Sequence, residues 1–508
     1  MTDKTPHQKN GVWQKIIGLE QQVRTVFWPI FGKEHIKFLP LAFMMFFILF
    51  DYSMMRSLKD AMVVTEVGSE AIGFIKTYFV FPSAILLTLI YYSLCRAMDP
   101  KRVFYVIVGF FLLYFIVFTA YMFPYMDSLV LSDAWAQSVT ASAPPLRWFI
   151  RVIQYWPHTT FYIISELFGS TMVSLFFWQL ANQVTNPDEA KRHYSMFGLL
   201  GNVGLLGTSY AIDYALNKKA VPDFNLLFMM IIVGLVLITA LYAFVQVQVE
   251  TNPDLIKGVV KVKKKSKQKP SIGESIKVVF SSKYLGLLAL LLICYGVSNV
   301  LIENVWKDRV KALYPSKAAY AAFMGNYQWY LGNMSIFFML VGSNILRMVS
   351  WATAAILTPL MFLVTAALFF LFIFDSLAGN AALLSGLIGG AMVLQWAVMI
   401  GTAQNVLSKS TKYSLFDSTQ KMAYMPLDDE LKTRGMSAVE VIGGRFGKMG
   451  GGVINSTLLI LLPAWSLMDL SPILAVLCGI IVVIWISSVF SLGKKYNFAM
   501  AKQAEQGA

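Results

Sequence analysis

Charged residues interrupt the apolar stretches of this sequence at a few points, and these are the points where chemistry can occur. One stretch ends with Arg56, Lys59 and Asp60, whose spacing of three and four residues puts them on one face of a helix. An ionisable group inside an apolar span is costly unless it is paired or hydrated, so it is a candidate for function. The alternative for Arg56 and Asp60 is a helix end whose charges reach the membrane interface.

Two acidic residues further along the chain stand out for opposite reasons. Glu166 lies within the apolar segment Tyr162–Gly169 and has no basic residue within reach on its own helix. The partner of its carboxylate must therefore be a residue of another helix, a proton or a substrate complex. Glu303 and Lys307 form an i, i+4 pair in the favourable order, which also fits a purely structural salt bridge.

Two cations near the end of the chain favour an anionic ligand. Arg445 and Lys448 are three residues apart, flanked by glycines, with only Glu440 as a local carboxylate. A polyvalent anion needs several such ligands, because each charge-assisted contact contributes little once desolvation is subtracted. The candidate anion ligands are Arg56, Lys59, Arg445 and Lys448.

The sequence gives no sign of hydrolytic, metal or cofactor chemistry. The nearest match to a phosphate-binding GxxxxGK[ST] loop is Gly443–Met449, which is one residue short, lacks the hydroxyl and has no strand before it. Cysteine and histidine show no metal-ligand spacing. An enzyme acting on lipid-linked substrates would need a long acidic loop, and none is present. We therefore expect neither an enzyme nor a cofactor.

Composition sets the class of protein that carries these residues. The chain has 508 residues, of which 57% are hydrophobic and 14% charged, and its mean hydropathy is +0.61. Soluble proteins carry about 25% charged residues, so we predict an all-α polytopic membrane protein with about 12 transmembrane helices. The expected spans lie near residues 38–58, 72–95, 102–123, 157–184, 194–216, 225–248, 283–304, 319–345, 348–374, 381–406, 436–463 and 470–493.

Basic residues predict the orientation of these spans. When the loops are sorted by side, including a loop at 407–435, 29 of the 42 Lys and Arg residues fall on the side that carries both termini. Cytoplasmic loops collect such residues, so both termini are expected in the cytoplasm. No soluble basic domain exists to bind nucleic acid, despite the net charge of +14. The first 37 residues do not resemble a signal peptide, and a bacterial inner membrane is the simplest location.

An internal repeat divides the spans into two groups of six. Gly198 and Gly444 are 246 positions apart, and the same shift carries four first-half spans onto second-half spans. Asn202 then corresponds to Lys448. The predicted division is a tail at 1–37, a half at 38–248, a basic linker at 249–282, a half at 283–493 and a tail at 494–508. This 6+6 pseudo-repeat is major-facilitator-like, a layout that binds substrate between its halves, although helix packing alone also explains the glycines.

Longer motifs across residues 31–495 resemble one known family. The motifs include Arg56-Ser57-Leu58-Lys59-Asp60, Phe74-Ile75-Lys76, Ser165-Glu166-Leu167-Phe168-Gly169-Ser170, Val305-Trp306-Lys307, Gln404-Asn405-Val406-Leu407-Ser408-Lys409-Ser410-Thr411-Lys412-Tyr413 and Arg445-Phe446-Gly447-Lys448. On these motifs the chain resembles the bacterial and plastid-type ATP/ADP translocases, which typically exchange external ATP for internal ADP in intracellular bacteria or plastids. The resemblance implies that Lys59, Glu166, Glu303 and Lys448 are essential for transport.

The sequence also departs from the pattern of this family. Asp51 stands where Asn is usual, and Met449 replaces a Ser beside a presumed phosphate ligand. These changes leave base selectivity and the mode of exchange open, and Asp51 is a candidate for proton coupling. The alternative to ATP/ADP antiport is a proton-coupled or exchange transporter for GTP or a broad set of nucleoside triphosphates.

Together these observations predict a nucleotide transporter that works by alternating access. Lys59 and Lys448 are expected to hold the phosphates, and Glu166 and Glu303 to pair with these lysines when the site is empty. The predicted partners are ATP, ADP, further nucleotides or phosphate as cargo, and membrane lipid, and a monomer is expected. The remaining candidate site residues are Arg56, Asp60, Asn202, Lys307 and Arg445.

Overall fold

The computed structural model describes residues 30–253, 282–378, 383–427, 435–436 and 438–507, with Leu255, Lys277 and Val279 as isolated positions. The predicted tail at 1–37 and linker at 249–282 therefore lie mostly outside the described residues. Within the described ranges the chain forms helices and turns and no strand. The predicted all-α class is confirmed.

Elements before residue 250, here called the first half, follow the first six predicted spans. The long helices often end in a wide π-helical turn. The spanning elements are η1 (Gly32–Glu34), α2 (His35–Met62), η2 (Val63–Val67), α3 (Ala71–Phe74), η3 (Ile75–Val80), α4 (Phe81–Ala97), α5 (Pro100–Val117), η4 (Phe118–Met122), α9 (Trp156–Thr171), η6 (Met172–Phe177), α10 (Trp178–Val184), α11 (Pro187–Asp213), η7 (Tyr214–Lys218), α12 (Phe224–Phe244) and η8 (Val245–Val249). The short elements between the third and fourth spans are α6 (Met126–Leu129), α7 (Asp133–Ser142), η5 (Pro144–Leu146) and α8 (Arg147–Gln154).

Elements after residue 282, here called the second half, follow the other predicted spans. They are α14 (Lys283–Leu313), α15 (Lys317–Met348), α16 (Trp351–Leu377), α17 (Leu383–Ile388), α18 (Gly390–Thr411), η10 (Lys412–Phe416), α19 (Asp417–Met422), η11 (Glu440–Arg445), α21 (Phe446–Leu461) and α22 (Leu467–Gly507). The loop expected to begin at residue 407 is wrong at its start, because helix continues through α18, η10 and α19 as far as Met422.

Ten helices in the described ranges are long and apolar enough to cross a membrane. The two other expected spans, 381–406 and 436–463, coincide with α17–α18 and η11–α21, which do not meet the same measure of length and hydropathy. Outward-facing leucines and valines confirm that lipid is the surrounding solvent, since a water-soluble protein does not expose apolar faces of this size. Residues more than half exposed include Leu86, Leu89, Leu113, Val233, Leu371 and Val483. The chain is a multi-pass membrane protein.

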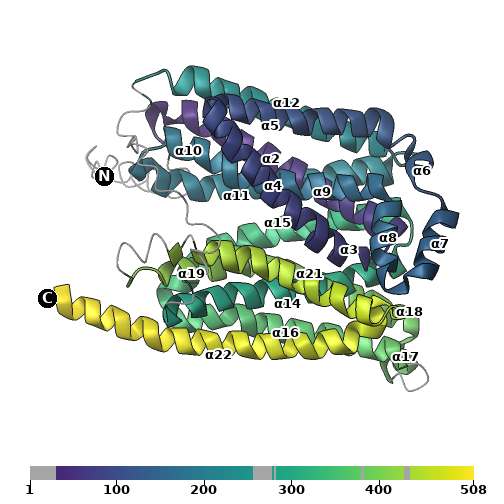
Figure 1. Ribbon diagram of the computed structural model, residues 1–508. Coiled ribbons are helices and arrows are strands. Elements are labelled where there is room, and N and C mark those ends of the chain that lie inside the picture. The colour runs from purple at the N-terminus through teal and green to yellow at the C-terminus, as the bar shows by residue number, and fades with distance from the viewer. Residues whose placement is uncertain are drawn as a thin grey trace, which may run out of the picture.

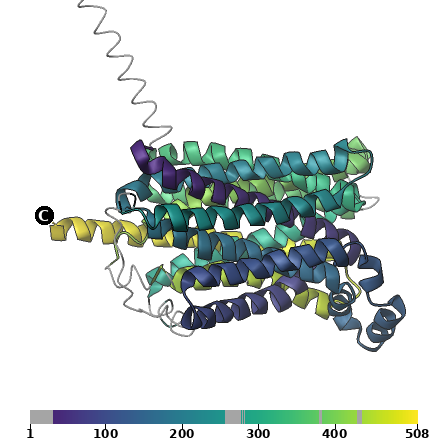
Figure 2. The same cartoon turned by 90° about the horizontal axis from the view of Figure 1, so that it is seen from above.

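The long helices run lengthwise through the molecule and define two ends (Figure 1). The proximal end is where α2 begins and α22 finishes, and the distal end carries α7, α8 and α17. Seen from above, the last turns of α22 project beyond the other helices at the proximal end (Figure 2).

Glycines set the closest helix contacts in both halves. A side chain at Gly204 of α11 would meet the backbone of Phe46 and Phe50 on α2. In the second half, a side chain at Gly296 of α14 would meet the backbone of Gly447 on α21, 2.7 Å away. Small residues let helix backbones approach, so the repeated glycines serve packing at these positions.

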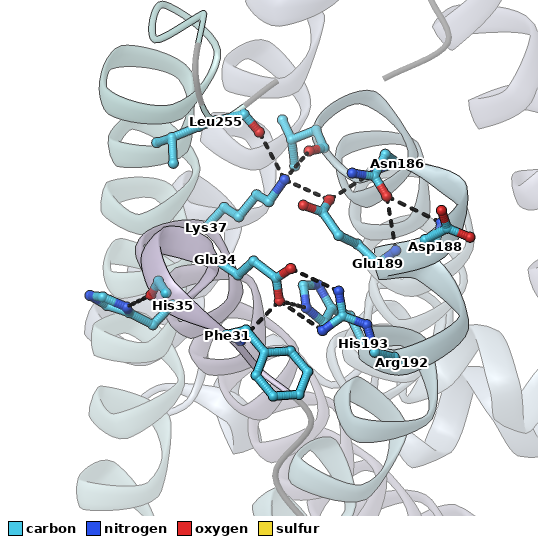
Figure 3. A network of polar contacts seen from close by, with 12 residues as sticks. Phe31, Glu34, His35, Lys37, Asn186, Asp188, Glu189, Arg192, His193 and Leu255 are labelled. Atoms are coloured by element: carbon cyan, nitrogen blue, oxygen red, sulfur yellow. Dashed lines mark hydrogen bonds and ion pairs between the residues drawn. The ribbon is translucent and has the colours of Figure 1, made fainter. Parts of the chain in front are cut away.

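A buried lysine fixes the start of α2 at the proximal end (Figure 3). The Nζ atom of Lys37 donates to Glu189 Oε2 at 2.5 Å and to the Leu255 carbonyl at 2.8 Å. A third, longer contact of 3.4 Å reaches the Val184 carbonyl. Lys37 is only 2% exposed. The three contacts join α2 to the end of α10, to the start of α11 and to the chain that follows α12.

A second ion pair strengthens the same corner. Both carboxylate oxygens of Glu34 accept hydrogen bonds from the Arg192 guanidinium, at 2.9 and 2.7 Å. His193 lies 3.5 Å from the same carboxylate (Figure 3). A bidentate pair of this kind fixes geometry as well as charge, so the first turn of α2 has a defined position on α11.

Replacing Lys37 by Met is expected to destabilise the protein by roughly 3–5 kcal/mol, because it leaves the buried Glu189 carboxylate without its counter-charge. Thermal unfolding of the purified protein in detergent measures the effect. The matched control is Lys101→Met, which removes an exposed pair with Glu250 and should cost less than about 1 kcal/mol. Equal unfolding midpoints for the two variants would contradict this assignment.

Candidate functional site

The centre of the molecule contains a buried ion pair within the first half. The Nζ atom of Lys59, on α2, lies 2.8 Å from Glu166 Oε1 on α9 and 3.2 Å from Asp60 Oδ1. It also lies 3.6 Å from the centre of the Tyr162 ring. Lys59 is 1% exposed. The partner of Glu166 is therefore a residue of another helix, which was one of the three possibilities left open by the sequence.

Glu303, on α14, has three basic side chains within 4.0 Å of one carboxylate oxygen. Its Oε1 atom lies 3.2 Å from Lys307, 3.5 Å from Arg56 and 3.4 Å from Lys409. The other oxygen accepts a hydrogen bond of 3.3 Å from Asn299. A carboxylate shared in this way gives less than one full counter-charge to each cation.

Two ion pairs connect the halves at this point. Lys307 lies 2.8 Å from Asp60 Oδ2, and Arg56 lies 3.5 Å from Glu303. With the Lys59 contacts, they form one chain of charges through α9, α2 and α14. We call this set the central network, and its members are Arg56, Lys59, Asp60, Glu166, Glu303, Lys307 and Lys409.

The central network contains more basic side chains than carboxylates. Four cations, Arg56, Lys59, Lys307 and Lys409, face three carboxylates. Burying ion pairs costs desolvation energy that their attraction does not always offset. A cluster with an excess of basic side chains and shared carboxylates can therefore exchange its internal partners for an anionic ligand.

Lys448 lies apart from these ion pairs. It is exposed on α21, and no carboxylate oxygen lies within 4.0 Å of it among the described residues. Its ammonium still interacts electrostatically with Glu166. Glu303 pairs with Lys307, Arg56 and Lys409 rather than with Lys448, which differs from the expectation that this glutamate neutralises it. Arg445 lies on η11, and its side chain is outside the described part.

Two other predicted site residues make no hydrogen bond to the central network. The Asn202 amide donates to the Gly198 carbonyl of its own helix, at 2.8 Å, and faces Met339 of α15. Asp51 is fully buried, and neither carboxylate oxygen has a hydrogen-bond partner in the described ranges. A side chain at Gly234 of α12 would collide with the Asp51 carboxylate. Asp51 therefore lies between α2 and α12.

The sequence reasoning missed Lys409. That residue had been counted with a cytoplasmic loop, but α18 carries it into the core, where its Nζ donates to the Tyr327 hydroxyl at 3.0 Å. The neighbouring Ser408 hydroxyl donates to Asn299 at 3.2 Å. The detectable signal was the run of polar residues from Gln404 that lies inside a helix otherwise rich in apolar residues. Polar side chains inside a membrane helix are costly unless they face other polar groups in the protein interior.

Contacts between the halves also close the distal end. The Ser69 hydroxyl donates to Asp308 Oδ1 at 2.8 Å, and Lys317 lies 3.0 Å from Glu66. The Glu70 carboxylate accepts the backbone N–H of Leu467 at 3.4 Å. Burial and, to a smaller extent, the Asp308 carboxylate raise the pKa of Glu70. In this conformation the first and second halves are joined both at the distal end and through the central network.

Charged groups and aromatic rings make up the site. No group of three or more His, Cys, Asp or Glu residues with a metal-binding arrangement occurs among the residues described. Aromatic side chains adjoin the cations instead, with Tyr162 against Lys59 and Tyr327 against Lys409. Such a centre can hold a polyanion beside flat apolar surfaces.

Known proteins similar to this chain are transporters and carriers. The family model described as TLC ATP/ADP transporter matches residues 16–496. ADP,ATP carrier protein 1 of Rickettsia conorii is 49% identical over 486 residues, covering 95% of this chain and 97% of the relative. ADP,ATP carrier protein 3 of Rickettsia prowazekii is 37% identical over 494 residues, covering 94% and 97%. The solved structure of nucleoside transporter NupG is 11% identical with a TM-score of 0.49, over 91% of this chain and 99% of that chain.

Proposed function

The chain belongs to the TLC ATP/ADP transporter family, and from this premise we propose that it exchanges ATP for ADP across a membrane. It is a transporter and not an enzyme. The observation that carries the proposal beyond family membership is the central network, in which four cations share three carboxylates and two ion pairs connect the halves. A nucleotide phosphate chain supplies the negative charge that this network lacks.

Phosphate binding would act by replacing carboxylates. Lys59 is held by Glu166 and Asp60, while Lys307 is held by Asp60 and Glu303. A phosphate that contacts these lysines competes with the carboxylates that hold them. The same glutamates would neutralise the lysines again after release, so the empty site would not retain uncompensated positive charge. Lys448, which is exposed, is available to the phosphates without such a replacement.

This competition would couple binding to movement of the halves. A ligand shifts a conformational equilibrium only if it binds two conformations differently. Lys307–Asp60 and Arg56–Glu303 exist only while the halves are close at the centre, so phosphates that displace them would change the contact between the halves. Residues 38–248 and 283–493 would then be the units that move in alternating access.

Locking the distal end should stop transport. Because the Ser69 and Asp308 side chains touch, a Ser69→Cys, Asp308→Cys double variant is expected to form a disulfide under oxidising conditions. Exchange should then fall to background, because the distal end can no longer open, and return when a reductant is added. ATP uptake into proteoliposomes, before and after reduction, measures this.

The controls for this disulfide are the two single variants and the parent chain, whose described cysteines are all free. Each should transport equally well when oxidised and reduced. Full exchange by a double variant shown to be cross-linked would mean that the distal contact does not open during transport.

Finer features of the function rest on the sequence. The excess of Lys and Arg on one side favours cytoplasmic termini in a bacterial inner membrane, which would make the proximal end cytoplasmic. Charge balance is a further requirement, because ATP carries about one more negative charge than ADP and moving a charge across 100 mV involves about 2.3 kcal/mol. Co-movement of phosphate or protons would meet it. We take the transporting unit to be a monomer.

Counter-exchange in proteoliposomes tests the proposed function. Vesicles containing the purified protein are preloaded with ADP, ATP, GTP, AMP or buffer and are given labelled ATP outside. We expect rapid ATP uptake with ADP or ATP inside and little uptake with buffer inside. Uptake that is equally fast into empty vesicles and depends on an imposed pH gradient would replace antiport by proton-coupled transport. Absence of ATP uptake under every condition would overturn the proposal.

A further inference from the structure

Lys76 is a central cation that neither the sequence reasoning nor the proposed mechanism has used. It was named only as part of the Phe74-Ile75-Lys76 motif. In the structure it lies on η3, within the candidate span Ala71–Ala97, and is half-buried. It interacts electrostatically with Glu166 and Glu303, so its side chain is within range of the central network.

Within the described ranges, Lys76 has no ion-pair partner of its own. No carboxylate oxygen lies within 4.0 Å of its ammonium in the ranges that the structure describes, whereas Lys59, Lys307 and Lys409 each have at least one such partner. A lysine inside a membrane span without a close counter-charge is costly. Such a residue calls for an explanation, and a ligand that arrives from outside is one.

Helix packing brings Lys76 to within about one helical turn of Lys448. A side chain at Gly73 would touch Asn455 and the Gly452 carbonyl on α21, 3.4 Å away. One turn on, a side chain at Gly452 would collide with Thr77. The segment made by α3 and η3 therefore lies directly against α21.

An aromatic contact fixes the other end of this segment. The rings of Phe81, on α4, and Phe446, on α21, have centroids 6.3 Å apart. From Gly73 to Phe81 the residue numbers rise, while those of their contacts on α21 fall from Asn455 to Phe446. The two segments therefore run antiparallel. Lys76 lies between Gly73 and Phe81, and Lys448 lies between Phe446 and Gly452. These contacts place Lys76 opposite Gly452, so the two lysines lie about one helical turn apart, on facing helices from opposite halves.

We propose that Lys76 and Lys448 form a two-lysine clamp that binds the phosphate chain of the transported nucleotide across the boundary between the halves. This inference rests on the proposed function and adds a residue to it. Both ammonium groups interact with Glu166, and neither has a carboxylate oxygen within 4.0 Å among the residues that the structure describes. Two like charges on neighbouring helices repel each other, and a phosphate group that contacts both would remove that repulsion.

The clamp also gives phosphate binding a mechanical consequence. Lys76 belongs to the first half and Lys448 to the second, so one phosphate held by both would keep η3 and α21 in contact. The central network responds in the opposite direction, because phosphates displace Lys307–Asp60 and Arg56–Glu303. Bound nucleotide would thus exchange ion pairs between the halves for contacts through its own phosphates.

Nucleotide binding by Lys76→Gln tests the clamp. Isothermal titration of the purified protein with ATP and ADP should show a dissociation constant raised by about 10- to 100-fold, the loss expected for one charge-assisted contact. Lys76→Arg should retain most of the affinity because the charge remains. The matched control is Lys219→Gln, whose lysine pairs with Asp223 at the protein surface, and it should bind as the parent chain does.

A double variant distinguishes a shared phosphate from general electrostatics. If both lysines hold one phosphate group, Lys76→Gln with Lys448→Gln should weaken binding by less than the product of the two single effects. Independent, fully multiplicative effects would show that the lysines do not share a ligand. Affinity of Lys76→Gln equal to that of the parent chain would overturn the clamp outright.

Thiol protection keeps the clamp testable if Lys76→Gln does not fold. Lys76→Cys is labelled with a negatively charged thiol reagent, and ATP and ADP should slow the labelling while adenosine should not. Equal labelling with and without ATP would contradict the clamp. Failure of the parent chain to bind either nucleotide would instead overturn the proposed function, and the clamp with it, whereas a parent chain that binds ATP beside an unaffected Lys76 variant would overturn the clamp alone.

Discussion

Replacing Lys448 by Ala is expected to reduce ATP/ADP exchange by about 100-fold while leaving the thermal unfolding midpoint unchanged. A charge-assisted contact contributes about 1.5–3 kcal/mol, which corresponds to roughly 10- to 150-fold. Lys448 is exposed and has no carboxylate within ion-pair distance in the described part. The folded protein therefore loses little when the ammonium is removed, and the effect should fall on transport.

Counter-exchange in proteoliposomes and unfolding in detergent together measure this prediction. Lys448→Arg is the matched variant, because it keeps the charge and changes only the geometry of the contact. We expect it to retain part of the exchange. A Lys448→Ala protein that folds normally and exchanges ATP at the parent rate would remove Lys448 from the phosphate site.

Glu303→Gln, unlike Lys448→Ala, is expected to lower stability as well as transport. This substitution removes the shared counter-charge of Arg56, Lys307 and Lys409. Leaving buried charges uncompensated costs roughly 3–5 kcal/mol, so the unfolding midpoint should fall clearly. Exchange should also fall, at least about 10-fold, at temperatures where the variant is folded, because the cations can no longer return to a carboxylate after the phosphates leave.

A second substitution separates the two effects of Glu303→Gln. Adding Lys409→Met removes one of the uncompensated cations, and part of the lost stability should return without recovery of exchange. Glu250→Gln is the control, since Glu250 pairs with an exposed lysine and should cost less than about 1 kcal/mol. A Glu303→Gln variant as stable as the parent would show that the carboxylate does not neutralise the buried cations.

These two expectations differ because the residues are paired differently. Lys448 and Lys76 have no close carboxylate among the residues described, whereas Lys59 and Lys307 are buried in ion pairs. Loss of an unpaired cation removes a ligand contact. Loss of a paired one also leaves a buried charge behind, so its effects on transport and on stability cannot be separated without a compensating second substitution.

Much of the fold could be predicted from the sequence. Stretches of about 20 apolar residues can satisfy their backbone groups within a membrane only as helices, and the observed helices follow the predicted spans closely. The start of the 407–435 segment was placed in a loop because charges such as Lys409 and Lys412 lower its hydropathy. Those charges face the protein interior or its edge, and hydropathy averaged along the chain does not distinguish such a face from a loop.

The candidate site could be predicted only in part. Lys59 and Glu166 stood out because each interrupts an apolar stretch, and the structure brings them within 2.8 Å of each other. Lys76 was missed because it lies near the start of its span, where a lysine ordinarily reaches the membrane interface. Its position relative to Lys448 depends on how Gly73 packs against Gly452, a contact between residues almost four hundred positions apart.

The sequence by itself determined that this protein spans a membrane many times through helices and that ionisable groups lie inside the spans. The length of an apolar stretch and the charges within it can be read directly from the sequence, and they do not depend on how the helices pack. Only the tertiary structure decided which charges neutralise one another: Glu166 holds Lys59, and Glu303 is shared by Arg56, Lys307 and Lys409. Ion pairing falls off steeply with distance, so it depends on which helices pack together, and that packing left Lys448 and Lys76 without a close carboxylate in the part of the chain described.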